Sequence, residues 1–537
     1  MIRSMDVECL TYRKTGYFTK LITDYLDENK NLRPFCNHFP SLEAFKQQLE
    51  EKKASYPAQH RQVLCEVLTS QYDGIKLSKA TSNHLKNLQE QSTFTVVTGH
   101  QLNLFTGPLY FLYKIISTIN LCKELAAAYP EFKFVPVYWM ATEDHDFEEI
   151  NYFNFRGQKI KWNKDLTGAV GRFDTKGLDA VYSAFKLVVG NNERSDYLLQ
   201  LFKEAYLDHQ NLAEATRFIA NELFGAYGLV TVDGDDARLK KLLAPYIEQD
   251  LLEKRSFQEV SKTIEQWGDL ESKYKVQVNP REINYFYLRD QVRERIVENE
   301  NGFMVNDSDI RFTRKEILKE LETHPERFSP NVITRPLYQE VVLPNLCYIG
   351  GGGEIAYWLE LRSTFDSNSI PFPILLLRNS ALVISGKQNN KLKNLNLNLE
   401  DVFLKQSSLI NKKIREISNI NIDLSAQKKH LKEQFENLYK IAELTDKSFM
   451  GAVKAQEVKQ IKGIDHLEKR LLKAQKRKLK DQVIRMTELQ NQLFPNESLQ
   501  ERILNFSELY LEFGPELIPR LMDALKPLKL EFTVIKL

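Results

Sequence analysis

Cysteine is scarce in this sequence, because only five of the 537 residues are cysteine and no two of them form a CxxC pair. Their odd number and wide spacing argue against a disulfide framework and against a cysteine-based zinc site, and fit buried thiols in a reducing compartment. Apolar runs are short, and none approaches the roughly 18 residues that a membrane span requires. The N-terminal segment lacks the continuous apolar stretch of a secretory signal, so we expect a cytoplasmic protein that contacts no membrane.

An excess of one charge is absent too. Lys and Arg together number 74 and Asp and Glu 72, which gives a formal net charge of +2. This balance argues against a nucleic-acid footprint spread over the surface, so we expect no nucleic-acid partner. The apolar fraction of 42% and the charged fraction of 27% are typical of a soluble globular protein. At roughly 100 to 200 residues per domain, the length predicts three or four domains.

An α/β fold is indicated by the segment 94–149. Residues 94–99 form a short β-prone run closed by glycine, and a helical pattern follows with Pro108 near its first turn. A second β-prone run covers 132–141. Two such runs joined by a helix predict a right-handed βαβ unit in a parallel sheet that is buried on both faces.

Further strand signals lie far along the chain, at 228–234, 332–354 and 371–380. The sheet is therefore expected to be assembled from distant segments, with the stretches between them inserted into a doubly wound core. The expected divisions are a helical N-terminal layer at 1–93, core parts at 94–149, 221–264 and 326–385, insertions at 150–220 and 265–325, a coiled coil at 386–495, and a C-terminal segment that packs back on the core at 496–537.

A coiled coil is predicted by the heptad spacing of the segment 446–493. Four apolar residues recur there every seven positions: Leu472, Leu479, Met486 and Leu493. A continuous helix of this length would be about 70 Å long, which is too long to be buried within one domain. We expect it to project and form a homodimer, or to fold back on the preceding helix at 424–444.

The first candidate site is the segment TGHQLNLFTGP, residues 98–108, which joins the first strand to its helix. Parallel sheets bind ligands at the carboxyl ends of their strands, and a helix N-terminus there offers free N–H groups to an anion. His100 and Gln101 would point into that crevice and stabilise charge on a phosphoryl or acyl centre, where one such donor contributes roughly 2.7 to 4 kcal/mol. The alternative is a glycine turn with a surface histidine.

The second candidate site follows the next strand, where WMATEDHDFEE, residues 139–149, would place Glu143, Asp144 and His145 at the mouth of the same sheet. Such a cluster could hold an amine substrate, act as a general base or bind a divalent ion. The alternative is a helix N-cap followed by acidic residues that the helix dipole favours. That alternative explains Glu143 and His145 less well, so we expect one crevice shared with His100.

The third candidate site is CYIGGGGEIAYW, residues 347–358, in which four glycines separate a strand from an apparent helix. Glycine lets the backbone approach a ligand closely, but neither a Walker A loop nor a full GxGxxG unit is present. Glu354 could hold an amine or a hydroxyl group, and a tight strand-to-helix turn is the alternative. Upstream, Arg335 and Gln339 are expected on an extended segment after Pro330 as carboxylate or phosphate contacts.

The residues after the last expected strand form a fourth candidate group. They suit a nucleotide phosphate or ribose, and an ordinary polar loop is the alternative. The group consists of Arg378, Ser380, Ser385, Gly386 and Lys387. No residue of the chain is assigned as a metal ligand.

Three of these segments together resemble the bacillithiol biosynthesis cysteine-adding enzymes, the cysteine ligase family. They are TGHQLNLFTGPLYFLYK, PVYWMATEDHDFEE and SPNVITRPLYQEVVLPNLCYIGGGGEIAYW. The resemblance runs almost end to end, and it implies a Rossmann-like core with two connecting-peptide insertions and a coiled-coil dimerisation domain, related in architecture to class I aminoacyl-tRNA synthetases. The implied reaction joins cysteine to the amino group of glucosaminyl-malate.

An amide-forming reaction of this kind requires an activated carboxylate, so we expect ATP or ADP to be used. In the implied arrangement His100 and Gln101 stabilise the transition state, while Glu143, Asp144 and His145 engage the amine. Substrate contacts are expected from Thr98, Gly99, Asn103, Arg335, Gln339, Gly352, Glu354 and Tyr357. The alternatives are another synthetase-like amide-forming or nucleotidyl-transfer enzyme, and a non-catalytic dimeric scaffold that senses a nucleotide.

Overall fold

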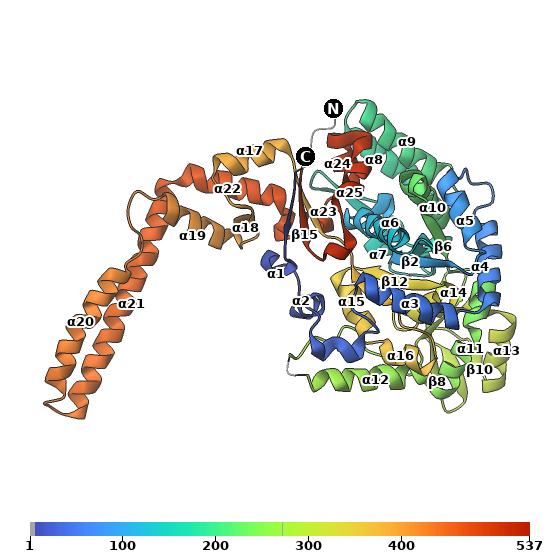
Figure 1. Ribbon diagram of the computed structural model, residues 1–537, viewed down its shortest axis with the longest axis horizontal. Helices are drawn as coiled ribbons and strands as arrows, with labels where there is room; N and C mark the ends of the chain where they lie inside the picture. Colours follow the sequence, from blue (N-terminus) through green and yellow to red (C-terminus); the bar gives the residue numbers. More distant parts are fainter. Residues whose placement is uncertain (1–5, 271) are drawn as a thin grey trace. The chain divides into compact units, whose positions relative to one another are not determined.

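The structure is a computed structural model, and it describes residues 6–270 and 272–537 (Figure 1). The chain divides into two compact units. The first, called the core unit here, contains Tyr17–Leu382 and Gln500–Ile535 together with the residues up to Arg13. The second, called the helical unit, contains Val383–Leu499 with two short terminal pieces. None of the helices described has both the length and the apolarity needed to cross a lipid bilayer.

A five-stranded sheet with the order β13-β12-β2-β3-β6 forms the centre of the core unit. Every neighbouring pair in it is parallel, which confirms the predicted Rossmann-like α/β core. The five strands come from distant parts of the chain, as the β-prone runs indicated. They are β2 (Thr93–His100), β3 (Lys133–Met140), β6 (Val230–Asp233), β12 (Asn345–Gly350) and β13 (Ile374–Leu377).

Both faces of this sheet are covered, because successive side chains of each strand point to opposite faces and both sets are apolar. Val96 belongs to a core cluster that includes side chains of α3 (Leu42–Ser55) and α6 (Tyr110–Ala128). Its neighbour Val97 belongs to a second cluster that includes side chains of α4 (Ala58–Gln71) and α11 (Ala237–Glu253). The helix α6 connects β2 to β3 and completes the predicted βαβ unit.

Two insertions extend the core unit between its central strands. The first contains an antiparallel hairpin, β4 (Tyr152–Phe155) and β5 (Gln158–Lys161), and three helices, α8 (Leu178–Val189), α9 (Glu193–Leu207) and α10 (Leu212–Phe224). The second contains an antiparallel sheet with the order β10-β9-β8-β7-β11. Its elements are α12 (Arg255–Gly268), β7 (Tyr285–Arg289), β8 (Val292–Asn299), β9 (Gly302–Val305), β10 (Arg311–Phe312), α13 (Arg314–Thr323) and β11 (Phe328–Pro330).

The ends of the chain contribute a small sheet that the sequence did not indicate. Its order is β1-β15-β14, with β1 (Asp6–Leu10), β15 (Phe532–Lys536) and β14 (Ala381–Ile384). The N-terminal layer is otherwise helical and also contains α1 (Tyr12–Thr15), α2 (Lys20–Leu26) and α5 (Lys79–Asn87). The last segment of the core unit contains α23 (Gln500–Ile503), α24 (Phe506–Phe513) and α25 (Leu517–Ala524).

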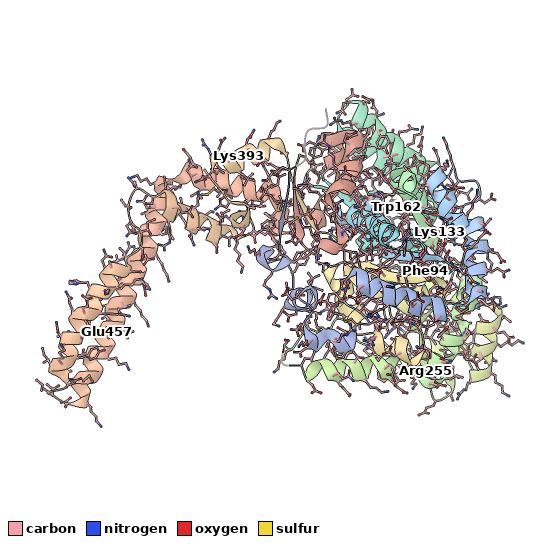
Figure 2. The ribbon with its side chains drawn as sticks, in the orientation of Figure 1. Phe94, Lys133, Trp162, Arg255, Lys393 and Glu457 are labelled. Carbon is pink, nitrogen blue, oxygen red and sulfur yellow. The ribbon has the colours of Figure 1, made fainter. Side chains whose placement is uncertain are left out.

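The helical unit consists of α17 (Gly386–Asn394), α18 (Leu399–Val402), α19 (Gln406–Ile417), α20 (Ser425–Ala442), α21 (Lys447–Lys478) and α22 (Lys480–Leu493). The predicted continuous helix is interrupted at Leu479, whose backbone angles leave the helical range. The helix α20 folds back on α21 and buries Phe435, Ala442 and Val453. Tyr439 of α20 donates a hydrogen bond of 2.7 Å to Glu457 of α21, which is labelled in Figure 2.

Candidate functional site

A cavity of about 500 Å³ opens at the carboxyl ends of β2, β3 and β12 in the core unit. This is the edge at which open parallel sheets bind ligands. The residues that follow each of the three strands line it, and other elements add charged side chains. The charged lining residues are Lys114, Arg293, Arg335, Arg378, Arg502, Glu143, Asp144 and Glu354.

His100 lies in this cavity at the end of β2 and is 8% exposed. Its ring packs against the rings of Tyr110 and Phe111 at the start of α6. Burial, with the positive charges of Lys114 and Arg378 nearby, holds the pKa of His100 well below its ordinary value, so the imidazole is neutral. Its Nε2 atom is buried and has no hydrogen-bond partner among the described residues.

Gln101 links the two segments that the sequence assigned to one crevice. Its Nε2 donates hydrogen bonds to Asp144 Oδ2 at 2.9 Å and to Glu149 Oε2 at 3.0 Å. Gln101 and Asp144 both line the cavity. The turn that follows β2 and the acidic turn that follows β3 therefore meet at one place, as the parallel sheet requires.

Glu143 is held by a lysine of α11. Lys240 forms an ion pair with Glu143 Oε1, and its ammonium also donates to the carbonyl oxygen of Phe328 at 2.7 Å. Burial raises the pKa of the Glu143 carboxyl above its ordinary value, although the positive charge of Lys240 opposes this shift. A buried carboxyl group with a raised pKa is suited to accept a proton from a substrate near neutral pH.

His145 does not line the cavity itself and contacts two residues that do, Arg293 and Asp144. It is half exposed, and its Nδ1 lies 2.6 Å from Nη1 of Arg293 on β8. Because a guanidinium is always a donor, Nδ1 of His145 accepts this hydrogen bond. Arg293 lines the cavity and packs over the ring of Phe286, with 4.1 Å between the guanidinium and the ring centroid. The structure thus presents Arg293, and not His145, to a ligand.

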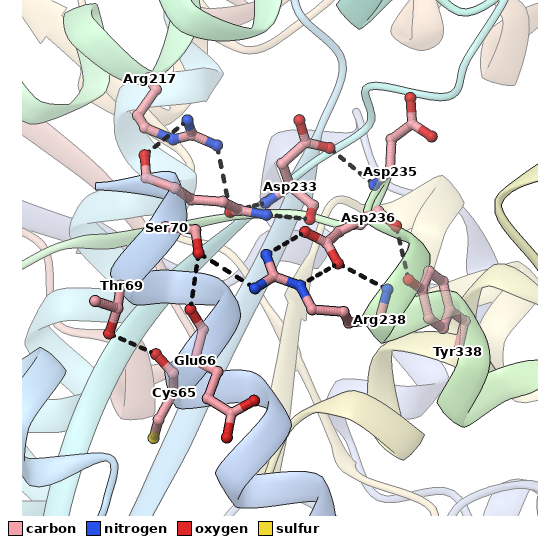
Figure 3. Close-up of polar contacts among 12 residues, drawn as sticks. Cys65, Glu66, Thr69, Ser70, Arg217, Asp233, Asp235, Asp236, Arg238 and Tyr338 are labelled. Carbon is pink, nitrogen blue, oxygen red and sulfur yellow. Dashed lines mark hydrogen bonds and ion pairs between the residues drawn. The ribbon is translucent and has the colours of Figure 1, made fainter. Parts of the chain in front are cut away.

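The carboxylates after β6 do not reach the cavity, although this strand ends at the same edge of the sheet. Asp233 accepts a hydrogen bond from Thr142, and Asp235 binds Arg172 through two hydrogen bonds of 2.7 and 2.8 Å. Asp236 caps α11 and pairs with Arg238, as Figure 3 shows. These three carboxylates therefore form hydrogen bonds and ion pairs within the protein.

Lys114, which is buried, and Glu354, which is partly exposed, form an ion pair in the cavity wall. Lys114 comes from the interior of α6, and its Nζ lies 2.6 Å from Glu354 Oε2 and donates to the carbonyl oxygen of Gly99 at 2.7 Å. Glu354 comes from α15 (Gly352–Leu359) and also accepts hydrogen bonds from the Tyr348 hydroxyl and from the backbone N–H of Gly351. The pKa of Glu354 is lowered although burial opposes this, because Lys114 and these donors stabilise its charge.

Arg335 reaches the cavity from a helix, which corrects the predicted extended segment. It begins α14 (Arg335–Val342), whose first turn accommodates Pro336, and the strand signal holds only from Asn345 onward. Gln339 lies one turn later and accepts a hydrogen bond from Arg335 Nη1 at 3.1 Å. Gln339 is buried and does not line the cavity, so it positions Arg335.

The other predicted substrate contacts divide into two groups. Gly99, Gly352 and Tyr357 line the cavity. A side chain on Gly99 would lie 3.1 Å from the Tyr348 hydroxyl, so glycine keeps this wall open. Thr98 and Asn103 do not line it: the hydroxyl of Thr98 donates to the carbonyl of Ile349 on β12, and the amide of Asn103 donates to the carbonyl of Glu149.

The predicted nucleotide-binding group is divided between the two units. Arg378 lines the cavity and forms an ion pair of 2.7 Å with Glu501, which also accepts a hydrogen bond of 2.9 Å from the hydroxyl of Ser380. Ser385 belongs to the helical unit, where its hydroxyl caps α17. Gly386 and Lys387 begin that helix and do not line the cavity.

Comparisons with known proteins agree with this architecture. The family model "Bacillithiol biosynthesis BshC, N-terminal Rossmann-like domain" matches residues 5–379, and "Bacillithiol biosynthesis BshC, C-terminal coiled-coil domain" matches residues 381–537. The chain belongs to the bacillithiol biosynthesis BshC family. The family predicted from the sequence is thereby confirmed. The two matches meet within a few residues of the boundary between the core and helical units.

Relatives of the chain cover it almost completely. It is 57% identical to a protein of Christiangramia forsetii over 99% of both chains, and 55% identical to one of Flavobacterium johnsoniae over 99% of this chain and 100% of the relative. It is 28% identical to a protein of Bacillus mycoides over 94% of this chain and 95% of the relative. Each of these relatives carries the name "Putative cysteine ligase BshC".

Three charged cavity residues of this BshC-family chain were not found by sequence reasoning. Lys114 had a detectable signal, since it is a lysine on the otherwise apolar stripe of α6 and such a residue needs a partner when buried. Arg293 lies on a strand of the second insertion, and Arg502 lies in the last segment of the core unit. No local pattern in the sequence distinguishes these two arginines from surface residues.

Among the described residues, no three His, Cys, Asp or Glu side chains come together in a way that could hold a metal ion. The acidic residues of the cavity are engaged instead by Lys240, Gln101 and Lys114.

Proposed function

We propose that this protein is a cysteine ligase that joins the carboxyl group of cysteine to the amino group of glucosaminyl-malate through an amide bond. Membership of the BshC family and the names of the relatives support the ligase activity. The observation that carries the proposal is the charge of the 500 Å³ cavity, which sets unpaired cations opposite carboxylates.

The cations of the cavity fit the malyl part of the acceptor. Arg293, Arg335 and Arg502 line the cavity and form no ion pair with a carboxylate in the part of the chain that the structure describes. Malate carries two carboxylates, and arginine binds a carboxylate through two parallel hydrogen bonds. A site with these three arginines, whose charges are not neutralised by an ion pair, selects an acidic acceptor over a neutral amino sugar.

The carboxylates of the cavity fit the reacting amine. An amine attacks a carbonyl carbon only when it is neutral, and the nitrogen must lose a proton as the amide forms. Glu143, with its raised pKa, is placed to accept that proton, while Asp144 is fixed by Gln101. We propose that the neutral His100 donates a hydrogen bond from its unpartnered Nε2 to the oxygen on which negative charge develops.

The carboxyl group of cysteine must be activated before an amine can attack it at neutral pH. We propose that ATP supplies this activation, with ADP as the product or as an alternative ligand. The polar groups buried without partners at the cavity, His100 Nε2 and Arg378 Nε, fit an oxygen-rich ligand of this kind.

The test is the reaction itself. The purified protein is incubated with cysteine, glucosaminyl-malate and ATP, and the products are analysed by mass spectrometry. The expected product has the mass of the two substrates less one water, and it should be absent when cysteine or the nucleotide is omitted. In the living cell, deletion of the gene should remove the cysteinyl thiol while glucosaminyl-malate accumulates. Unchanged thiol levels would exclude the proposal.

The protein is also proposed to form a homodimer through its coiled coil. Large apolar side chains are exposed near the tip of the α20–α21 hairpin, including Ile441, Leu444 and Phe449. Sedimentation equilibrium of the whole protein should give twice the chain mass, and replacing Leu444 and Phe449 by Ser should shift the equilibrium to the monomer. If the unaltered protein is a monomer at all concentrations, the proposed homodimer is contradicted.

A further inference from the structure

A second cavity, of about 360 Å³, adjoins the first one within the core unit. Its walls include the segment Tyr17–Ile22 and residues of the loop that precedes β7. Four residues line both cavities: Gly352, Gly353, Arg378 and Arg502. We call these four residues the shared wall. Because the same groups face both spaces, a ligand in one cavity lies next to a ligand in the other.

The first feature of the shared wall is the N-terminus of a helix. Gly352 and Gly353 are the first two residues of α15, so their backbone N–H groups have no acceptor inside the helix and carry a partial positive charge. No atom lies within 4 Å of the position that a Cβ of Gly353 would occupy. The backbone here is therefore open to a ligand, and it offers N–H donors to an anion.

The second feature is a buried arginine with a free donor. Arg378 is 4% exposed, and its Nη1 is used by Glu501, by the Ser380 hydroxyl and by the carbonyl of Asn379. Its Nε is buried and has no partner among the described residues. This Nε lies 3.8 Å from the position that a Cβ of Gly351 would occupy, so the free donor faces the start of α15. A buried donor of this kind requires an acceptor, and nothing in the described protein supplies one.

The third feature is the charge of the second cavity. Among the described residues that line it there is no aspartate or glutamate, whereas Lys273, Lys275 and Arg502 add positive charge to that of Arg378, and Lys20 is paired with Asp24. Arg502 is exposed and makes no ion pair in the described part of the chain. The described lining of the second cavity is thus cationic, while that of the first combines cations with the carboxylates of Glu143, Asp144 and Glu354.

We infer that the shared wall is an oxyanion-binding site, which holds a phosphate or carboxylate group of a second ligand seated in the second cavity. The placement of an amine acceptor in the first cavity rests on the proposed function, whereas the oxyanion site does not. In this arrangement the amine and the anionic ligand approach each other across Gly352 and Gly353. A phosphate of a nucleotide and the carboxylate of an amino acid present the same chemistry to this site.

The inference is tested by placing a carboxylate in the site. In Gly353→Asp, the new side chain lies in the first turn of α15, where the helix dipole favours a negative charge, so the fold is retained while the site is filled. The matched control is Gly353→Asn, which has the same shape without the charge. The probes are inorganic pyrophosphate and, separately, cysteine, and their binding to the whole protein is measured by isothermal titration calorimetry at low salt.

The expected result is that at least one probe binds the unaltered protein and binds at least tenfold more weakly to Gly353→Asp than to Gly353→Asn. Pyrophosphate binding would assign the site to a phosphate source, and cysteine binding to a carboxylate source. Arg502→Gln should weaken the binding of the same probe and make its affinity less dependent on salt. Arg314→Gln, a substitution at an exposed residue of α13, should leave the affinity unchanged.

The inference is overturned if neither probe binds the unaltered protein, or if Gly353→Asp and Gly353→Asn bind the probe equally well. Thermal denaturation of both variants checks that they are folded to the same extent. Because the readout is binding, it separates this inference from the proposed function. If Gly353→Asp weakens probe binding but the protein has no ligase activity, the proposed function is wrong and the oxyanion site is retained.

Discussion

At the scale of single residues, the Lys114–Glu354 pair places a positive and a negative charge together in the wall of the cavity. We expect Lys114→Met to lower the free energy of unfolding by about 1 to 3 kcal/mol, because it leaves the partly buried carboxylate of Glu354 without its cation. Urea denaturation measures this change. The double variant Lys114→Met/Glu354→Gln should recover most of the loss. A double variant as unstable as the single one would show that packing, and not charge, is the cause.

A substitution of His100 is expected to reduce activity without reducing stability. We expect His100→Leu to keep or raise the melting temperature, since the imidazole has a buried Nε2 without a partner, and to reduce kcat by about 100- to 1,000-fold through the loss of one donor to the developing charge. Steady-state kinetics of the proposed ligase reaction and thermal denaturation of the same preparation measure the two effects. A variant with unchanged kcat would exclude His100 from the reaction.

Sequence reasoning found the cavity residues that follow strands and missed those that reach it from elsewhere. His100, Gln101, Glu143 and Asp144 follow adjacent parallel strands, and the geometry of a parallel sheet brings such residues together. The sequence also predicts His145 in this cluster, but His145 does not line the cavity and its ring accepts a hydrogen bond from Arg293, which does. This distinction depends on where β8 of the insertion lies, and one sequence does not determine the packing of an insertion.

At the scale of secondary structure elements, Glu360 at the end of α15 fixes the loop that lines the second cavity. Its carboxylate accepts hydrogen bonds from the backbone N–H groups of Gln277 at 2.8 Å and Val278 at 3.1 Å. The side chain is fully buried, and this burial raises the pKa of Glu360 to about 7. The folded protein therefore binds a proton at Glu360 more readily than the unfolded chain does.

A carboxyl group with a raised pKa gives stability that is fully present below its pKa in the unfolded chain and is lost as the pH rises to its pKa in the folded protein. For Glu360 this window lies between about pH 4.5 and pH 7. We expect Glu360→Gln, which does not titrate, to remove a decrease of unfolding free energy on the order of 1 to 3 kcal/mol across that window. Urea denaturation of both proteins at pH 5 and pH 7 measures the difference. If the unfolding free energy changes by the same amount between pH 5 and pH 7 in both proteins, the raised pKa of Glu360 is contradicted.

The turn after β6 is packed too tightly for a side chain. A Cβ on Gly234 would lie 2.6 Å from Trp139 Cζ2 and 3.2 Å from the ring of Tyr338, whose hydroxyl donates to the carbonyl of Gly234. We expect Gly234→Ala to lower the unfolding free energy by about 1 to 3 kcal/mol through overpacking. The matched control is Gly268→Ala at the end of α12, where no atom lies within 4 Å of the new Cβ. Chemical denaturation of both variants should show a loss only for the first.

Helices and strands were predicted correctly where hydrophobic periodicity was strong. The prediction failed where the local backbone geometry determined whether a segment became a helix. The buried strands β2 and β3 and the helix α6 were predicted with limits close to those observed. The β-prone residues after Arg335 predict an extended segment, but Pro336 suits the first turn of a helix and α14 forms there. The break at Leu479 was also missed, because the heptad spacing of Leu479, Met486 and Leu493 continues across it.

At the scale of the whole molecule, the two units differ in how much apolar surface they bury. The core unit has clusters that extend over both faces of its parallel sheet, whereas the α20–α21 hairpin is held by three buried residues and a few half-buried ones. We expect the amides of α20 and α21 to exchange hydrogen at a lower opening free energy than those of β2 and α6, because opening the hairpin exposes little apolar surface. Native-state hydrogen exchange with mass spectrometry measures this order. Equal protection in the two units would contradict it.

The overall architecture was predictable because the order of β-prone runs, glycine turns and heptads is recorded along the chain. The resemblance to the cysteine ligase family also implies a Rossmann-like domain followed by a coiled-coil domain, and the two family models confirm both. The shared wall between the two cavities was not predictable. It combines Gly352 and Gly353 with Arg502, which lies about 150 residues later in the chain, and no periodicity in the sequence relates the two.

The ion pair between Arg378 and Glu501 has a consequence for synthesis in the cell. Glu501 is buried, and it belongs to the segment Gln500–Ile535 that completes the core unit. While a ribosome is still translating this segment, the emerged chain already contains Arg378 but not its carboxylate partner. Termination between Arg378 and Glu501 would therefore release a polypeptide that contains this arginine without its carboxylate and lacks the segment that completes the core unit, so we expect proteases to degrade it.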